Sequence, residues 1–397
     1  SYFPDIQSLL PKFNKEDPTN FIEMKIPMSD FQFGIYEEAR VEERKTELQN
    51  ASKRAKKGEG KDDLFSDSVS TYRVFSRAFC NFVFPRPHIL RPLPNDGSKT
   101  STIINEVVSE DLLDGITEEE RIIKEEEVED ESSEIDELEE EANRIEKVSA
   151  IKKYGERVND ALDELDKMKN EFLIPDKLKT YSPKFLSILE QLQNEENIGL
   201  NLIYSQFRTL EGIGIFSLVL EANGYAKFKL IKESGKWKID INKENRSKPK
   251  FVLYTGTESV EEKELIRKIF NGQWELLPPE LKSEVIELGN DLERKDPKEI
   301  YNESRKNKFG EIIKIFMITS SGAEGISLSN VRYVHIMEPY WHPVRIDQVI
   351  GRARRICSHQ DFNDDEKLKT VTVFLYLMVF TDSQKKEGSV ELRNKDR

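Results

Sequence analysis

Four residues near the C-terminus of this 397-residue chain have types and a spacing that could bind a phosphate group. Gln348, Gly351, Arg352 and Arg355 form the pattern Q-x-x-G-R-x-x-R in a segment with helical apolar spacing. Residues three apart lie on one face of a helix, so both guanidinium groups could converge on a single anion. Gly351 would let nucleotide or neighbouring backbone approach closely. An exposed basic helix with ordinary salt bridges is the alternative interpretation of this pattern alone.

A glycine-containing turn precedes that segment, at residues 319–325 with the sequence TSSGAEG. Gly322 and Gly325 allow the chain to turn sharply as it leaves an apolar strand. Thr319 and Ser320 place hydroxyl and backbone N–H groups at the turn, and such groups bind phosphate oxygens without reading bases. The turn and the arginine pattern together favour a site for phosphates.

The segments that must position these groups alternate between strand and helix from residue 181 onward. The predicted strands are 199–207, 250–256, 312–320, 331–338 and 370–380, and the predicted helices are 182–193, 210–225, 259–270 and 345–356. This alternation predicts an α/β fold, a parallel sheet with helices on both faces. Ligands of such folds bind beyond the carboxyl ends of the strands, where the TSSGAEG turn lies.

The rest of the chain divides by composition. Residues 1–91 form a region with a predicted strand at 22–28 and a predicted helix that Ser29 would cap. Residues 51–63 are predicted to be a solvated loop, and the proline-containing stretch 85–94 is predicted to be a linker. We expect an acidic, partly disordered or helical insertion over 92–175 and the α/β lobe over 176–397.

The negative charge of the chain is concentrated in that insertion. The segment Glu118–Glu141 contains fifteen acidic and two basic residues, a net charge of −13 against −14 for the whole chain. The remainder is nearly neutral, so the acidic balance does not exclude a nucleic-acid-binding face. A solvated insert and a helical arm that binds a partner are both compatible with this segment.

Several kinds of site are not expected. Cys80 and Cys357 are far apart, which indicates a reducing, intracellular setting, and the histidines are too scattered for a metal site. No apolar stretch approaches the roughly 20 residues that span a bilayer. The phosphate-binding pattern G-x-x-x-x-G-K-[ST] is absent, and DELD at Asp163 has the spacing of a charged helix face. Because the chain also begins at Ser1 without methionine, a fragment is expected.

These motifs occur together in a known family. From about Met24 to its C-terminus, the chain resembles the second RecA-like lobe of Swi/Snf-type superfamily-two ATPases, close to nucleoside triphosphatases and helicase-like proteins of poxviruses and giant DNA viruses. The segments that carry the resemblance are PMSDFQFGIY, SPKFLSIL, IYSQFRTLEG, YTGTES, ITSSGAEGISL and QVIGRARR, and STYRVFSRAFCNFVFP resembles the viral branch. His342 departs from the family, since many relatives have asparagine there.

The resemblance implies roles for individual residues. Arg352 and Arg355 would be arginine fingers that stabilise the charge of phosphoryl transfer, and Gln348 would support the nucleotide cleft. The other residues implied to face or shape the nucleotide site are Gly351, Gly322, Gly325 and Glu324. The residues implied to contact the nucleic-acid backbone are Thr319, Ser320, Ser205 and Gln206.

The resemblance also implies cofactors and partners. ATP and Mg would be held mainly by an N-terminal RecA-like lobe that this sequence lacks, and nucleic acid, with DNA favoured over RNA, would bind this lobe. The acidic insertion could engage the transcription machinery, and the location would be a virion or infected-cell cytoplasm. The alternative is a non-catalytic RecA-like module that binds nucleic acid or a transcription partner.

Overall fold

The structure, a computed structural model, describes residues 10–57, 74–92, 154–255, 258–290, 306–319, 325–339, 343–362 and 365–387. The acidic segment Glu118–Glu141 lies outside these ranges. The chain forms two units, and it crosses between them several times. The sheet unit comprises Ser1–Ile26, Lys184–Gln206 and Phe216–Met378, and the helical unit comprises Pro27–Pro183, Phe207–Ile215 and Val379–Arg397.

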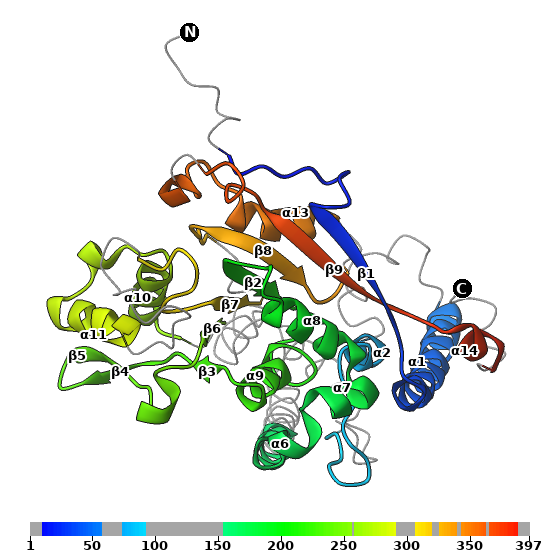
Figure 1. The fold of residues 1–397 in the computed structure, drawn as a ribbon. Helices are drawn as coiled ribbons and strands as arrows, with labels where there is room; N and C mark the ends of the chain where they lie inside the picture. The colour runs from blue at the N-terminus through cyan, green and yellow to red at the C-terminus, as the bar shows by residue number, and fades with distance from the viewer. Residues whose placement is uncertain are drawn as a thin grey trace, which may run out of the picture. The chain divides into compact units, whose positions relative to one another are not determined.

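A seven-stranded sheet with the order β1-β9-β8-β2-β7-β6-β3 is the centre of the sheet unit (Figure 1). The strands are β1 (Phe21–Pro27), β2 (Leu200–Tyr204), β3 (Ala226–Lys227), β6 (Lys250–Tyr254), β7 (Ile315–Ile318), β8 (Val331–Ile336) and β9 (Thr372–Val379). The pairings among β2, β3, β6, β7, β8 and β9 are parallel. β4 (Leu230–Glu233) and β5 (Lys236–Ile239) form a separate antiparallel hairpin between β3 and β6. The predicted parallel α/β fold is confirmed.

Helices cover both faces of this sheet. They are α8 (Pro183–Gln193), α9 (Ile213–Ala222), α10 (Val260–Phe270), α11 (Pro279–Asn290) and α13 (Pro343–Ala353). Every residue of β2 and β7 is buried, as expected for parallel strands covered on two sides. In Figure 1, α8 lies on the viewer's side of the strands and α13 lies behind them.

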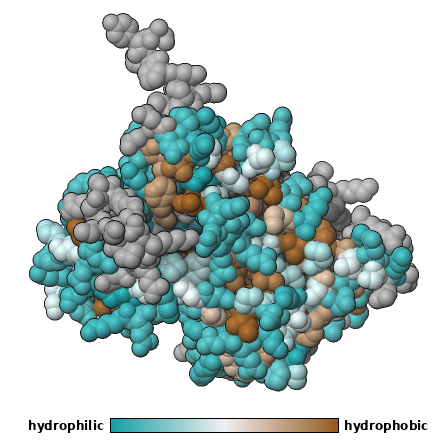
Figure 2. Space-filling model, in the orientation of Figure 1, coloured by the Kyte–Doolittle hydropathy of each residue, from teal (hydrophilic) through white to brown (hydrophobic). Residues whose placement is uncertain are grey.

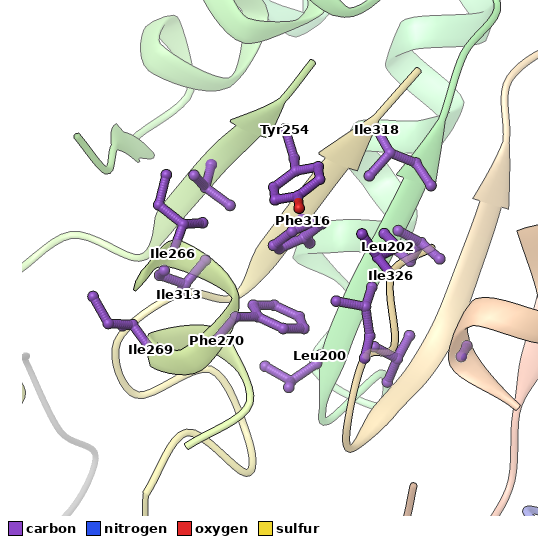
Figure 3. Packing of buried hydrophobic residues seen from close by; sticks show 14 of the residues in the cluster. Leu200, Leu202, Tyr254, Ile266, Ile269, Phe270, Ile313, Phe316, Ile318 and Ile326 are labelled. Atoms are coloured by element: carbon purple, nitrogen blue, oxygen red, sulfur yellow. The ribbon is translucent and has the colours of Figure 1, made fainter. Parts of the chain in front are cut away.

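Alternate residues of β2 point to opposite faces of the sheet. Leu200 and Leu202 join a large apolar cluster with Phe316 of β7 and with Ile266 and Phe270 of α10 (Figure 3). On the α8 side, the buried rings of Phe185 and Phe216 pack edge to face, with centroids 5.1 Å apart. These two apolar layers fix the register of the strands and therefore the positions of the strand ends.

The helical unit begins with α1 (Asp30–Lys57). The Ser29 hydroxyl accepts a hydrogen bond from the backbone N–H of Gln32 at 3.0 Å, which confirms the predicted N-cap. α1 continues to Lys57, so the prediction of a loop from residue 51 is wrong over 51–57. Alanine, lysine and arginine in this stretch are good helix formers, and the first glycine is Gly58. Further helices are α2 (Val74–Phe79), residues 154–167, α6 (Lys169–Phe172), α7 (Pro175–Tyr181) and α14 (Asp382–Glu387).

Two other sequence predictions fall in this unit. Asp163 lies in the helix of residues 154–167, where Val158 and Leu165 are buried, so its acidic neighbours occupy a helix face as predicted. The proline-containing stretch is not an exposed linker over residues 85–92, because Ile89 and Arg91 are buried there. Burial of an arginine requires a partner, and this partner comes from a distant segment.

On the face shown in Figure 2, hydrophilic residues predominate and hydrophobic ones form small groups. Exposed apolar residues scattered in this way are usual for globular proteins. No helix in the described part of the chain is long and apolar enough to cross a membrane.

Candidate functional site

The candidate site lies at the carboxyl edge of the sheet, where β7, β2 and β8 end side by side. Tyr204 at the end of β2 pairs with Ile318 of β7 and with Ile336 of β8. The Ser205 N–H donates to the Ile318 carbonyl at 3.2 Å, and the Met337 N–H donates to the Tyr204 carbonyl at 3.0 Å. Parallel pairing therefore brings together residues that are far apart in sequence, as the sequence predicted for this edge.

Thr319, directly after β7, is fully buried at 0% exposure. Its hydroxyl oxygen has no hydrogen-bond partner among the residues that the structure describes. Ser320, Gly322 and Glu324 lie outside the described residues. Gly325 is exposed and has a φ of +71°, a left-handed conformation that favours glycine, in agreement with the predicted sharp turn.

Ser205 and Gln206 are also buried, and both are bound to a residue that the sequence analysis did not single out. The Ser205 hydroxyl donates to Glu338 Oε1 at 2.7 Å, and the Gln206 N–H donates to Glu338 Oε2 at 2.8 Å. Glu338 is only 4% exposed. These polar groups directly after β2 therefore bind a carboxylate, and their contact with nucleic acid remains a prediction. An acidic residue two positions after an apolar strand was the available signal.

A second buried charged group, the Lys184 ammonium, binds the residue that precedes Glu338. Lys184, in the first turn of α8, is 2% exposed, and its ammonium donates to the Met337 carbonyl at 2.9 Å. A buried ammonium group must keep its hydrogen bonds, because desolvation without them is costly. The sequence places Lys184 in a predicted helix, but it cannot indicate the buried partner, because that partner is 153 residues away.

The arginine pattern lies on α13 and just beyond it. Gln348 and Arg352 are four residues apart on one helical face, with Gln348 exposed and Arg352 half-buried. Val349, Ile350 and Ala353 are buried on the other side. Gly351 has open space around it: no described atom lies within 4 Å of the position that a Cβ would take. Close packing of neighbouring backbone against Gly351, which the sequence suggested, is therefore not observed.

Arg355 does not share the helix with Arg352. α13 ends at Ala353, whereas the sequence predicted helix to residue 356. The Ser358 hydroxyl donates to the Ala353 carbonyl at 3.1 Å, and Cys357 has a φ of +62°, so the chain turns away after Arg355. The argument that two arginines share one helical face is wrong for Arg355. Its half-buried guanidinium forms no hydrogen bond or ion pair with the described residues.

The end of α13 is hydrogen-bonded to the segment that follows the glycine turn. The Leu328 N–H donates to the Arg352 carbonyl at 3.2 Å, and the Asn330 N–H donates to the Ser358 carbonyl at 2.8 Å. The structure therefore joins residues 328–330, which follow the glycine turn in sequence, to the end of α13 and the residues directly after it.

Two histidines near this region are neutral structural groups. Burial lowers the pKa of His359 to about 4, although its Nε2 donates to the Val331 carbonyl at 2.8 Å. Burial lowers the pKa of His335 on β8 to about 3. Its Nε2 lies 3.0 Å from Asn201 Oδ1, which only accepts, so Nε2 carries the proton and Nδ1 accepts from the Tyr376 hydroxyl at 2.8 Å.

The residues of this edge fit part of a nucleotide site. Arginine side chains supply positive charge, but the P-loop lysine and its neighbouring hydroxyl do not occur in the sequence. In the described part of the chain, no group of three or more His, Cys, Asp or Glu residues could hold a metal ion. His342, next to the site in sequence, lies outside the described residues.

Comparisons with known proteins agree with this geometry. Residues 237–357 match the family model "Helicase conserved C-terminal domain". This range of the chain includes β5, β6, β7, β8 and α13. A "Putative ATP-dependent RNA helicase" of Acanthamoeba polyphaga mimivirus is 31% identical over 52% of this chain, and a second protein so named from that virus is 25% identical over 90%. A "Termination factor NPH-I homolog" of African swine fever virus is 33% identical over 51% of the chain.

The chain spans only part of each relative, namely 27%, 38% and 26% of their lengths. Residues 237–357 therefore match the helicase conserved C-terminal domain, and the chain is similar to parts of helicase-like and NPH-I-like proteins of large DNA viruses.

Proposed function

We propose that this chain is the C-terminal RecA-like lobe of a viral, nucleic-acid-dependent ATPase of the helicase or translocase type. The observation that supports the proposal is the backbone hydrogen bond from the Leu328 N–H, three residues after the glycine turn, to the Arg352 carbonyl at 3.2 Å. That arrangement puts an arginine-bearing helix end beside the exit of the glycine turn. Since the sequence has no P-loop, ATP and Mg would be bound mainly by an N-terminal RecA-like lobe.

In this proposal Arg352 and Arg355 act as arginine fingers. Charge accumulates on the γ-phosphate oxygens during phosphoryl transfer, and an arginine that reaches them from a separate element stabilises that charge. Arg355 has a half-buried guanidinium that no described residue engages, as such a role requires. Gln348, on the same helical face as Arg352, would support the nucleotide cleft, together with Gly351 and the turn residues Gly322, Glu324 and Gly325.

Nucleic acid would bind at the same carboxyl edge. Thr319 and Ser320 would contact the backbone at the turn, and Ser205 and Gln206 would contribute from the end of β2. Thr319 and Ser205 are buried in this structure, so their hydroxyls would become available only when the edge rearranges. A cycle in which nucleotide closes the cleft and hydrolysis reopens it would provide such a rearrangement.

The finer parts of the proposal concern partners and location. We favour DNA over RNA, a transcription partner for the acidic insertion, and a virion or infected-cell cytoplasm. The similarity to a protein named as a termination factor supports a link to transcription, whereas two relatives are named as RNA helicases. Stimulation of hydrolysis by single-stranded DNA, duplex DNA and RNA of equal length would separate these possibilities.

The first test measures phosphate release. This chain alone should give no nucleic-acid-stimulated hydrolysis, and the two-lobe enzyme should give it. In the two-lobe enzyme, Arg352→Ala or Arg355→Ala should lower stimulated turnover by about 10³-fold, because one charge-stabilising arginine is lost. Affinity for nucleic acid, measured by fluorescence anisotropy, should change little.

Arg354→Ala is the matched control. Arg354 lies between the two fingers in sequence, but its Nε donates to the Pro11 carbonyl at 3.1 Å and its guanidinium lies 5.9 Å from the Phe13 ring centre. Its loss removes the same charge and should leave turnover near that of the unaltered enzyme. Normal turnover in both finger variants would remove the finger assignment, and robust turnover by this chain alone would favour a P-loop-independent activity.

A further inference from the structure

The backbone that follows α10 ends this helix without the Asn271 side chain. The Gln273 N–H donates to the Lys268 carbonyl at 2.9 Å, and the Gly272 N–H donates to the Ile269 carbonyl at 3.1 Å. This pair of bonds is a common way to end a helix at a left-handed glycine, and Gly272 has a φ of +69°. The position of Asn271 is therefore fixed by its own helix, while its side chain binds another segment of the sheet unit.

That segment is residues 327–329, which follow the glycine turn. Asn271 Nδ2 donates to the Ser327 carbonyl at 3.0 Å, and Asn271 Oδ1 accepts from the Ser329 N–H at 2.9 Å. Asn271 is only 6% exposed, so water cannot easily replace either bond. One amide therefore fixes the acceptor before Leu328 and the donor after it.

Leu328, between these two anchored residues, binds the end of the arginine helix. Its N–H donates to the Arg352 carbonyl at 3.2 Å. Its side chain is buried in the apolar cluster that also contains Phe270, the last residue of α10. Figure 3 shows Phe270 in this cluster together with Ile326, two residues before Leu328. The Leu328 N–H is therefore held in place from α10 by the Asn271 amide and by this packing.

The same segment also binds the residues that follow α13. The Asn330 N–H donates to the Ser358 carbonyl at 2.8 Å, and the Ser358 N–H donates to the Arg355 carbonyl at 3.1 Å. The backbone that carries Arg352 and Arg355 is therefore bonded at its start to Leu328 and, through Ser358, to Asn330. All of these residues belong to the sheet unit.

We propose that Asn271 is a positioning residue, which sets the place of residues 352–355 through the backbone of residues 327–330. An amide suits this task because it supplies a donor and an acceptor at a fixed separation and brings no charge into a buried place. The catalytic consequence rests on the proposed function of Arg352 and Arg355. The linkage itself rests on the hydrogen bonds alone.

Hydrogen exchange of the 397-residue chain tests the linkage without any catalytic assay. Asn271→Ala should raise amide exchange by about tenfold over 326–330 and by about threefold over 352–358, because the first stretch loses its anchor and the second is bonded to the first. Asn271→Ser keeps one polar group, and it should give the same pattern with smaller amplitude should Asn271→Ala fail to fold. Unchanged exchange in either stretch would overturn the proposal, and so would equal acceleration in α8 and β2.

Asn307→Ala is the matched control, since Asn307 is another buried amide that binds the end of α10. Its Nδ2 donates to the Phe270 carbonyl at 2.9 Å and to the Ile313 carbonyl at 3.0 Å, and its Oδ1 accepts from the Ile312 N–H at 2.8 Å. These bonds hold the start of β7 and do not involve residues 327–330. Loss of the Asn307 amide should therefore accelerate exchange over 306–314 and leave 326–330 unchanged.

Kinetics of the two-lobe enzyme test the catalytic consequence. Asn271→Ala should lower the stimulated kcat by about tenfold with less than about a twofold change in the KM for ATP, because misplaced arginines weaken binding of the transition state more than binding of the substrate. Asn307→Ala should destabilise the fold and leave kcat within about twofold. Equal losses of kcat in the two variants would show that stability alone is responsible and would overturn the positioning role.

A double-mutant cycle shows whether Asn271 acts through the arginine. In the Arg352→Ala background, Asn271→Ala should lower turnover by less than about twofold, because the group that it positions is already absent. A loss of about tenfold in both backgrounds would contradict the positioning role. An unaltered two-lobe enzyme without stimulated hydrolysis would refute the proposed function, and the exchange experiment would still decide the linkage.

Discussion

Two buried carboxylates, one in each unit, are held in different ways. In the helical unit, Glu211 accepts hydrogen bonds from Nε and Nη2 of Arg91, the second at 3.0 Å, and the guanidinium carbon also lies 5.1 Å from the ring centre of Phe75. In the sheet unit, Glu338 accepts from the hydroxyl of Ser205 and from a backbone amide. The first carboxylate is paired with a cation, and the second accepts from a hydroxyl and a backbone amide.

Because their partners differ, the two carboxylates should respond differently when a partner is lost. A paired guanidinium and carboxylate form a closed structural unit, because loss of either leaves an uncompensated charge. Glu338 has separate donors on its two oxygens, so loss of the Ser205 hydroxyl leaves the bond from the Gln206 N–H in place. Glu211 also uses its backbone carbonyl, which accepts from Asn81 Nδ2 at 2.8 Å. Four residues separate Gln206 from Glu211 in the sequence.

Arg91→Ala gives the largest expected effect and tests the charge-paired side of the comparison. It leaves Glu211 buried without its cation, so the free energy of unfolding should fall by about 3–5 kcal/mol. Urea unfolding followed by circular dichroism measures this loss. Arg86→Ala is the control, because Arg86 pairs with exposed Glu38 at 3.0 Å and its loss should cost at most about 1 kcal/mol. Equal losses in the two variants would contradict the distinction.

The pH dependence of stability provides the next effect, through the buried imidazole of His335, which binds the Asn201 amide and the Tyr376 hydroxyl. The pKa of folded His335 is about 3 because of burial, below the roughly 6.5 of an unfolded histidine. Between these values the unfolded chain binds more protons, so stability present above pH 6.5 is lost as pH falls towards 3. The slope from this residue should be up to about 1.4 kcal/mol per pH unit.

His335→Gln should remove that slope. The free energy of unfolding is measured at pH 6.5 and at pH 4.5, and it should fall less between these pH values in the variant than in the unaltered chain. His359→Gln is the matched variant, since burial lowers the pKa of His359 to about 4 and predicts the same sign. Parallel pH profiles of His335→Gln and the unaltered chain would show that His335 does not titrate in this way.

Ser205→Ala tests the carboxylate of the sheet unit and should have a smaller effect than Arg91→Ala. It removes the hydroxyl donor to Glu338 Oε1 and should cost about 1.5–3 kcal/mol, as expected for a hydrogen bond to a charged group. Thermal unfolding compared with Ser205→Thr, which retains a hydroxyl, measures it. A loss of unfolding free energy as large as that of Arg91→Ala would contradict the expected difference between the two carboxylates.

Much of the sheet unit could be predicted from local sequence. Apolar runs such as 331–338 have the length of buried strands, and apolar residues of 343–353 recur at helical spacing, so their types and order are fixed locally. The Gly325 turn was also predictable, because a left-handed residue favours glycine. The extent of α1 was underestimated, since its charged C-terminal half lacks apolar periodicity although its residues favour helix.

The candidate site was only partly predictable. The sequence indicated the arginine pattern, but it placed Arg355 on the helix, and the bond from Ser358 to Ala353 together with the left-handed Cys357 ends the helix earlier. It identified Ser205 and Gln206 as polar groups at a strand end without indicating that a carboxylate binds both.

The sequence by itself determined a parallel α/β lobe and the edge at which its polar segments end, because strand and helix periodicity are local properties. Only the tertiary structure decided which buried charges meet. Glu338 and Ser205 are 133 residues apart, and Arg91 and Glu211 are 120 apart. Such partners are chosen by sheet order and packing, so they become visible only when the chain is folded.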